Sequence, residues 1–123
     1  MSAGKTWTRK VSKSNGYLVL SDPVNPQGRN DPAGEITIQK GDVGTTGAKI
    51  IYTKDNTFDW DTSSPVVWKD NSAPSTSDIS ASVNGATLTI TDSDTDAGDT
   101  SYSYFLKASD GTETEDPTIH NRS

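Results

Sequence analysis

Apolar and polar residues alternate in short runs along this chain, which is the pattern of half-buried β-strands. Such runs lie at residues 6–11, 17–20, 35–39, 49–53, 66–68, 79–83, 86–91 and 102–108. Turn-forming Gly, Pro, Asp and Ser cluster between them, and no segment shows the period of an amphipathic helix. The pattern predicts an all-β fold, a single β-sandwich of about seven to nine mostly antiparallel strands.

The best-defined element is a hairpin around Asn84-Gly85. This dipeptide suits a two-residue type I′ turn, in which both central residues take positive φ. The resulting register pairs apolar residues with one another: Val83 with Ala86, Ala81 with Leu88, and Ile79 with Ile90. Hydroxyl side chains of the same strands fall on the opposite face, so a slip of one residue would bury them.

Length, charge and composition restrict the functions that this protein can have. A length of 123 residues suits one hydrophobic core, so we expect a single domain over residues 1–123. The net charge of −6 argues against nucleic acid and anionic membranes as partners. The chain has no cysteine, which excludes disulfides, thiol nucleophiles and zinc–thiolate sites. No apolar stretch approaches the length of a membrane span.

The first residues are polar and show no cleaved signal peptide. A cytoplasmic location and export without a cleaved signal both stay open, as does the oligomeric state. The segment 22–34, rich in Pro and Gly, is too long for a hairpin turn. It is either a recognition loop or an ordinary insertion at the rim of a sandwich.

From Leu88 onward, L-T-I-T-D-S-D-T-D-A-G-D-T-S-Y-S-Y, the chain resembles an immunoglobulin-like domain over residues 88–111. The resemblance implies a strand E, a turn at 96–98, and a strand F in which a tyrosine phenol bonds back to the backbone. Residues of strand F alternate inward: Tyr102, Tyr104, Leu106 and Ala108. Because the cysteines that join strands B and F in that family are missing, aromatic packing must carry more of the stability.

The last part of the chain suggests two more features. Residues 112–115, polar on both faces, fit a terminal edge strand protected from aggregation. The ending 116–121, D-P-T-I-H-N, resembles the tail of small bacterial β-domains, which implies no activity.

Four aspartates form the strongest candidate for a ligand site. Asp92, Asp94, Asp96 and Asp99 lie at closely spaced positions around a glycine, and carboxylates so arranged can converge on Ca²⁺. An EF-hand is excluded, because its sixth position would be Ala97 and its twelfth Ser103. The alternative is a solvated turn in which Asp96 caps its own backbone.

Trp60, flanked by Asp59 and Asp61, is the tryptophan expected to be most exposed and hence a candidate for binding a sugar. The alternative is that it fills the core. Catalysis has few candidates, because His120 is the single histidine. A hydrolase using paired carboxylates would need a cleft lined by Asp59 or Asp61 with a raised pKa.

The sequence therefore predicts a non-enzymatic binding or structural module that recognises a protein partner through loops or a sheet edge. One alternative is a calcium-dependent or carbohydrate-binding β-sandwich. A second is a small hydrolase. No catalytic residue is assigned, and Ca²⁺ is the one cofactor considered.

Overall fold

The computed structural model describes residues 4–69, 74, 78–94, 98–114 and 117–122. Its elements are β1 (Thr6–Ser14), β2 (Tyr17–Val24), β3 (Glu35–Ile38), the 3₁₀ turn η1 (Lys40–Asp42), β4 (Ala48–Lys54), β5 (Val66–Trp68), β6 (Ile79–Asn84), β7 (Thr87–Asp92), β8 (Thr100–Leu106) and β9 (Thr118–Asn121). Each of the eight predicted runs overlaps a strand, and the prediction of an all-β fold is confirmed.

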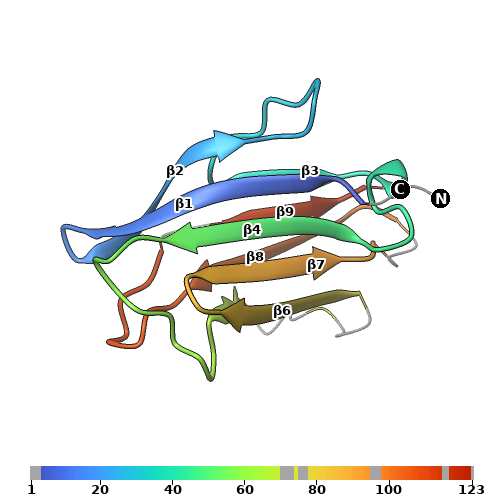
Figure 1. Cartoon of the computed structure of the whole chain (residues 1–123). Coiled ribbons are helices and arrows are strands. Elements are labelled where there is room, and N and C mark those ends of the chain that lie inside the picture. The colour runs from blue at the N-terminus through green and yellow to red at the C-terminus, as the bar shows by residue number, and fades with distance from the viewer. Residues whose placement is uncertain (1–3, 70–73, 75–77, 95–97, 115–116, 123) are drawn as a thin grey trace.

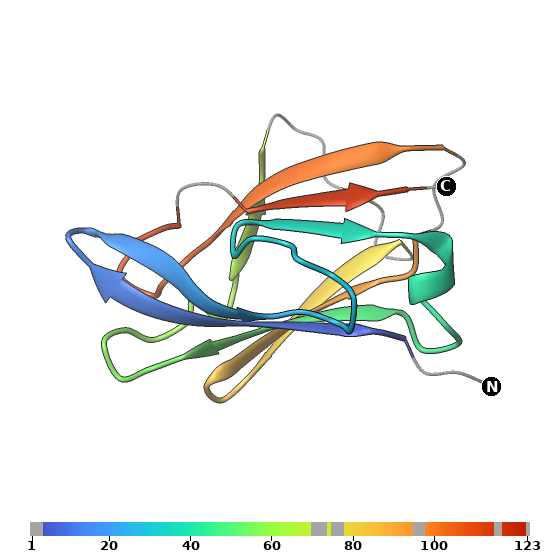
Figure 2. The same cartoon turned by 90° about the horizontal axis from the view of Figure 1, so that it is seen from above.

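The strands form two layers, one five-stranded in the order β2-β1-β4-β7-β6 and one four-stranded in the order β3-β9-β8-β5. Figure 2 shows the two layers facing each other, with the segment between β2 and β3 crossing from one to the other. Among the described strands, β1 pairs with β4 and β3 with β9 in parallel, and the other pairs are antiparallel. The molecule is therefore a β-sandwich of two mixed sheets.

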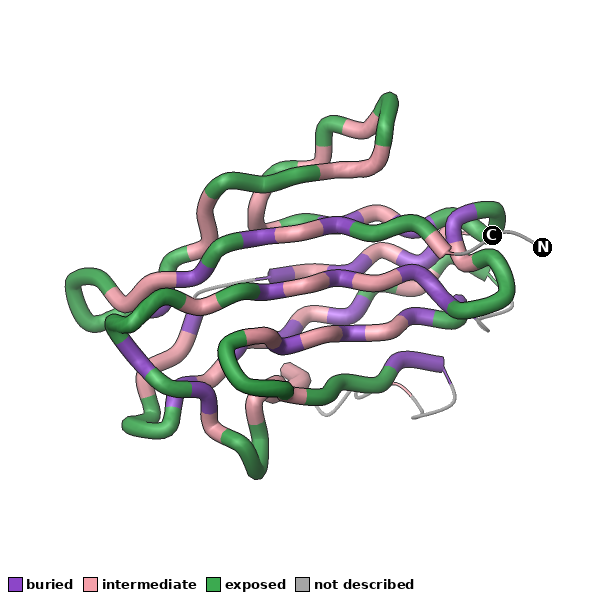
Figure 3. The backbone as a smooth tube through the Cα atoms, in the orientation of Figure 1, coloured by how far each residue is buried: buried purple, intermediate pink, exposed green. Residues whose placement is uncertain are grey.

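The core lies between the layers, where alternate residues are buried along most of β1, β3, β4, β7, β8 and β9 (Figure 3). The predicted inward face of β8 is confirmed, because Tyr102, Tyr104, Leu106 and Ala108 are all buried. Aromatic residues supply much of the packing. Trp68 on β5 lies with its ring centroid 5.0 Å from that of Tyr104. Such contacts contribute beyond the apolar area that they bury.

The β6–β7 hairpin forms, but its predicted register is wrong by two residues. Asn84 pairs with Thr87, so the turn residues are Gly85 and Ala86 rather than Asn84 and Gly85. Gly85 has φ of 62°, which suits the first central position of a type II′ turn. The carbonyl of Ala86 also accepts the Lys54 N–H. An even shift keeps every side chain on its predicted face, so the apolar pattern could not distinguish the two registers.

The C-terminal segment is also placed differently from the expectation. Residues 113 and 114 form isolated bridges rather than an edge strand, and residue 115 lies outside the described residues. The last strand is β9, which lies between β3 and β8 with Ile119 fully buried. The short ending is thus a central strand of the smaller sheet.

Candidate binding site at the open edge of the sandwich

Exposed apolar side chains gather on the edge strand β2. Across the described residues, the large hydrophobic side chains that are exposed are Tyr17 (53%), Val19 (45%) and Val24 (61%), all on β2. In Figure 1, β2 forms the upper border of the larger sheet, and the chain after it rises above this border before it returns to β3. A concentration of apolar side chains on one edge indicates an interaction surface.

A half-open pocket of about 400 Å³ lies along this edge. Its lining residues are Ser14, Asn15, Tyr17, Leu18, Val19, Leu20, Ala33, Gly34 and Thr114. None of them carries a charge, and the volume lies within the range of pockets that hold small ligands, about 300–1,000 Å³. One wall is β2 itself, and the opposite wall comes from the end of the segment between β2 and β3. The arrangement suits an apolar group held between two pieces of backbone.

A buried arginine fixes the distance between these walls. Arg9 on β1 is 1% exposed, and its Nε donates to the Ala33 carbonyl at 3.1 Å. Its terminal nitrogens donate to the carbonyls of Val24 at 3.4 Å and Pro32 at 3.1 Å, and to Asn25 Oδ1 at 2.9 Å. Burial lowers the pKa of Arg9, but a guanidinium stays charged at any physiological pH. Arg9 therefore ties the end of β2 to the far wall of the pocket.

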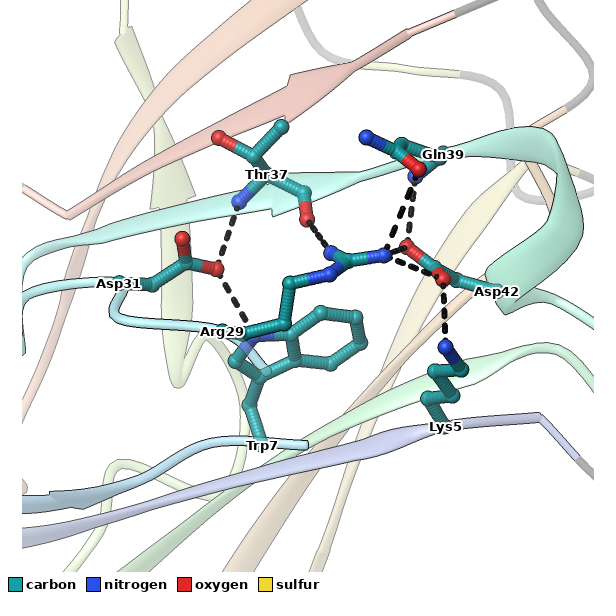
Figure 4. A network of polar contacts seen from close by, with 7 residues as sticks. All are labelled: Lys5, Trp7, Arg29, Asp31, Thr37, Gln39 and Asp42. Atoms are coloured by element: carbon teal, nitrogen blue, oxygen red, sulfur yellow. Dashed lines mark hydrogen bonds and ion pairs between the residues drawn. The ribbon is translucent and has the colours of Figure 1, made fainter. Parts of the chain in front are cut away.

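The same segment is held from its other side by Arg29 (Figure 4). Arg29 Nη2 donates to both carboxylate oxygens of the buried Asp42, at 2.6 and 2.8 Å, and the guanidinium carbon lies 5.9 Å from the Trp7 ring centroid. Burial acts to raise the pKa of Asp42, but hydrogen bonds from Arg29 and the Gln39 N–H outweigh it and lower the pKa overall. Residues 22–34 are thus fixed to the sandwich by two arginines.

Asp31 completes this support. Its Oδ2 accepts the Trp7 indole N–H at 2.9 Å and the Thr37 N–H at 3.2 Å, as Figure 4 shows. These bonds join β1, the long segment and β3. The pocket wall is therefore preorganised, which reduces the entropy lost when a partner binds.

The predicted calcium ligands lie at another end of the molecule, and the structure brings two of them together. Asp92 is fully buried, and its Oδ1 accepts the Asp94 N–H at 2.7 Å and Asn121 Nδ2 at 3.2 Å. Lys40 Nζ lies 3.2 Å from Asp94 Oδ1. Burial, together with the nearby charges of Asp78 and Asp94, raises the pKa of Asp92 to about 7.

The other two predicted ligands are not part of this group. Asp96 lies outside the described residues, and the exposed Asp99 pairs with Arg122 at 3.8 Å. Within the described ranges, no group of three or more acidic or histidine side chains could hold a metal ion. Calcium binding stays a prediction.

The Tyr102 hydroxyl was expected to bond to the backbone. In the structure it donates to the Asp78 carboxylate at 3.4 Å.

Trp60 does not lie where the sequence suggests. It is 3% exposed, its indole N–H donates to the Ala86 carbonyl at 3.0 Å, and its ring meets Phe58 edge-on at 5.0 Å. The expectation that Trp60 is the exposed tryptophan is therefore wrong. A β-bridge to Ala108 draws it inward, although both of its chain neighbours are acidic.

The groups considered for hydrolysis are also dispersed. Backbone N–H groups of Ser64 and Ser63 lower the pKa of Asp61, the opposite of what a general acid needs. Asp59 has a side chain that is 84% exposed. His120 bonds to Ser101 at 2.7 Å on the outer face of the smaller sheet, whereas the β2 pocket is lined by other strands.

The observations define a β-sandwich with an apolar pocket at one open edge. The chain matches no family model and no curated protein sequence. Among the described residues, no helix is long and apolar enough to cross a membrane. The pocket was not predicted from the sequence, although its signal is present there: Asn15-Gly16 is a hairpin dipeptide, and an uncharged run, Y-L-V-L, follows it.

Proposed function

We propose that the chain is a non-enzymatic binding module that takes an apolar group of a protein partner into the pocket beside β2. The observation that carries this proposal is the gathering of Tyr17, Val19 and Val24 on one edge strand that borders an uncharged pocket. Loops and edges positioned by a rigid scaffold are the usual recognition elements of small β-sandwiches. The double arginine support of the far wall fits such a role.

The strand order supports an immunoglobulin-like frame for this module. In that fold, strands A-B-E-D form one sheet and C-F-G the other. The order β4-β7-β6 corresponds to B-E-D and the order β9-β8-β5 to G-F-C. On this assignment, the β1–β2 hairpin extends the first sheet and forms one wall of the pocket.

On this assignment, a buried tyrosine pair would take the place of the family's disulfide. Tyr52 on β4 and Tyr104 on β8 correspond to strands B and F, and their hydroxyl oxygens lie 2.6 Å apart. Trp68 on β5, the strand assigned as C, packs against Tyr104. The arrangement supports the expectation that aromatic packing replaces the missing cross-link.

A fragment screen by NMR tests the proposed function. Small apolar fragments should shift the amide signals of Leu18, Leu20 and Ala33 in the wild-type protein. Ala33→Leu, which fills the pocket, should abolish these shifts, and the matched variant Ala81→Leu on the exposed part of β6 should keep them. Fragments that perturb other regions, or that bind Ala33→Leu equally well, would contradict the proposal.

A second candidate function is calcium binding at the acidic end. The fully buried Asp92 favours it, because its Oδ2 has no hydrogen-bond partner among the described residues. A site held at about 100 times its Kd would add about 2.7 kcal/mol of stability. Thermal melts in EDTA and in calcium test this, and the prediction requires a rise in midpoint that Asp94→Ala removes.

A further inference from the structure

The backbone of β2 is open for pairing beyond Leu18. The Leu18 N–H points away from β1, because it donates to the Glu113 carbonyl at 3.0 Å. In an antiparallel ladder, the direction of the peptide groups repeats every second residue, so those of Leu20 point the same way. In the described part of the chain, no segment outside β1 forms a hydrogen bond with the backbone of Leu20.

The molecule already pairs one piece of its own chain with this edge. Leu18 and Thr114 form an isolated parallel bridge at one end of the pocket. The edge is therefore straight and accessible enough to accept extended backbone there. The adjoining stretch from Leu18 to Leu20 has no charged or proline residue, the usual protection of an edge strand. The first charged residue of β2 is Asp22, and its proline is Pro23.

We infer that the occupant of this site is an extended polypeptide strand of another protein, which pairs with the backbone of β2 at Leu20 and inserts an apolar side chain into the pocket. The inference rests on the proposed function and names its partner class. Main-chain hydrogen bonds would supply affinity, and the pocket between Leu20 and Ala33 would select the side chain. The lining has no charge to match an acidic anchor.

A second copy of the chain fits the edge poorly. A two-fold pairing centred on Leu20 would place Leu18, already bonded to Glu113, opposite Asp22 of the other copy. The next residue, Pro23, has no N–H to donate. Each copy also carries a net charge of −6, which opposes association. The same charge favours a neutral or basic partner strand.

The test uses random heptapeptides selected for binding to the whole protein and counter-selected against Ala33→Leu. Each selected peptide is made in two further versions, methylated on alternate sets of backbone nitrogens. A strand added to an edge directs only one of these sets toward β2. We expect one methylated version to bind at least about tenfold more weakly and the other to bind like the parent.

Protein variants give a second readout. Val19→Lys places a charge on the binding edge, whereas Ser82→Lys places the same charge at an exposed position on β6, the opposite edge of that sheet. The selected peptides should lose affinity for the first variant and keep it for the second. Circular dichroism of both variants serves as the control for folding.

Three results would overturn the inference. If both methylated versions bind like the parent, the pocket accepts side chains alone, and the proposed function survives without strand addition. If every selected peptide binds Ala33→Leu as tightly as it binds the wild type, the partner is not a peptide strand. The proposed function is then tested by the fragment screen alone. If sedimentation shows a dimer that Val19→Lys dissolves, the edge pairs with a second copy instead.

Discussion

Asp92 couples the stability of this fold to pH. Its pKa is raised from 3.8 to about 7, chiefly by burial. The folded chain therefore binds this proton more tightly than the unfolded chain does. The stability that Asp92 contributes is greatest below about pH 4 and is lost as the pH rises through 7. We expect Asp92→Asn to be more stable than wild type at pH 8, by at least about 1 kcal/mol. Urea unfolding in EDTA at pH 5.5 and pH 8 measures this.

The substitution preserves the geometry, because an amide oxygen can accept the same bonds from Asp94 and Asn121. Asp55→Asn is the control. Hydrogen bonds from Ser12 and Thr57 lower the pKa of this exposed carboxyl to about 2, below the tested range, so this variant should keep the wild-type slope. A wild-type protein whose stability does not decline over this interval would contradict the assignment.

Arg9 stabilises the fold by holding three backbone carbonyls at once. Arg9→Lys keeps the charge but cannot reach the Ala33, Pro32 and Val24 carbonyls together. We expect a loss of about 2–4 kcal/mol in the free energy of unfolding. The same change at Arg122, whose exposed ion pair spans 3.8 Å, should cost about 0.5 kcal/mol or less. Equal costs in urea unfolding would show that Arg9 does not support the fold as described.

Among the elements, the two Asn-Gly dipeptides form different turns. Asn15 has φ of 54° and is a central turn residue, whereas Asn84 is a strand residue paired with Thr87. Asn15→Ala should therefore cost about 1 kcal/mol, because alanine disfavours positive φ. Asn84→Ala should change stability by about 0.5 kcal/mol or less. Urea unfolding of both variants distinguishes the registers, and a comparable loss at Asn84 would restore the type I′ turn that the sequence suggests.

Alternation predicted which segments are strands, but not how every strand pairs. The runs at β1, β4 and β7 are recognisable because polar residues alternate with apolar ones along most of each run, although Arg9 and Asp92 also lie on the buried faces. The parallel pairings depend on contacts between distant segments, which no local pattern encodes. β9 was missed because only Ile119 is apolar among its four residues, T-I-H-N, so no alternation of apolar and polar residues marks it. The pocket escaped prediction because Leu18, Ala33 and Thr114 are far apart in the sequence and meet only after the chain folds.

At the scale of the molecule, the two layers are joined through the core by the hydroxyls of Tyr52 and Tyr104. Both side chains are fully buried, and burial raises the pKa of Tyr52 to about 12, so this phenol stays neutral and can donate or accept. Changing either tyrosine to phenylalanine leaves the other hydroxyl without its partner, at a cost of about 1–3 kcal/mol. Changing both removes the unsatisfied group, so the double variant should lose less than the sum.

A double-mutant cycle in urea measures this coupling, with Tyr17→Phe on the exposed edge as a variant that should change little. A coupling of about 1 kcal/mol or more would show that the hydrogen bond between Tyr52 and Tyr104 helps to hold the two sheets together. The two sheets would then be held together in the core, so they would stay packed although the edge at β2 is open. Strictly additive losses would instead assign the cohesion of the sheets to apolar packing around Trp68 and Ile50. In that case the open edge would be expected to loosen as the core is weakened, and binding at the pocket should decline with it.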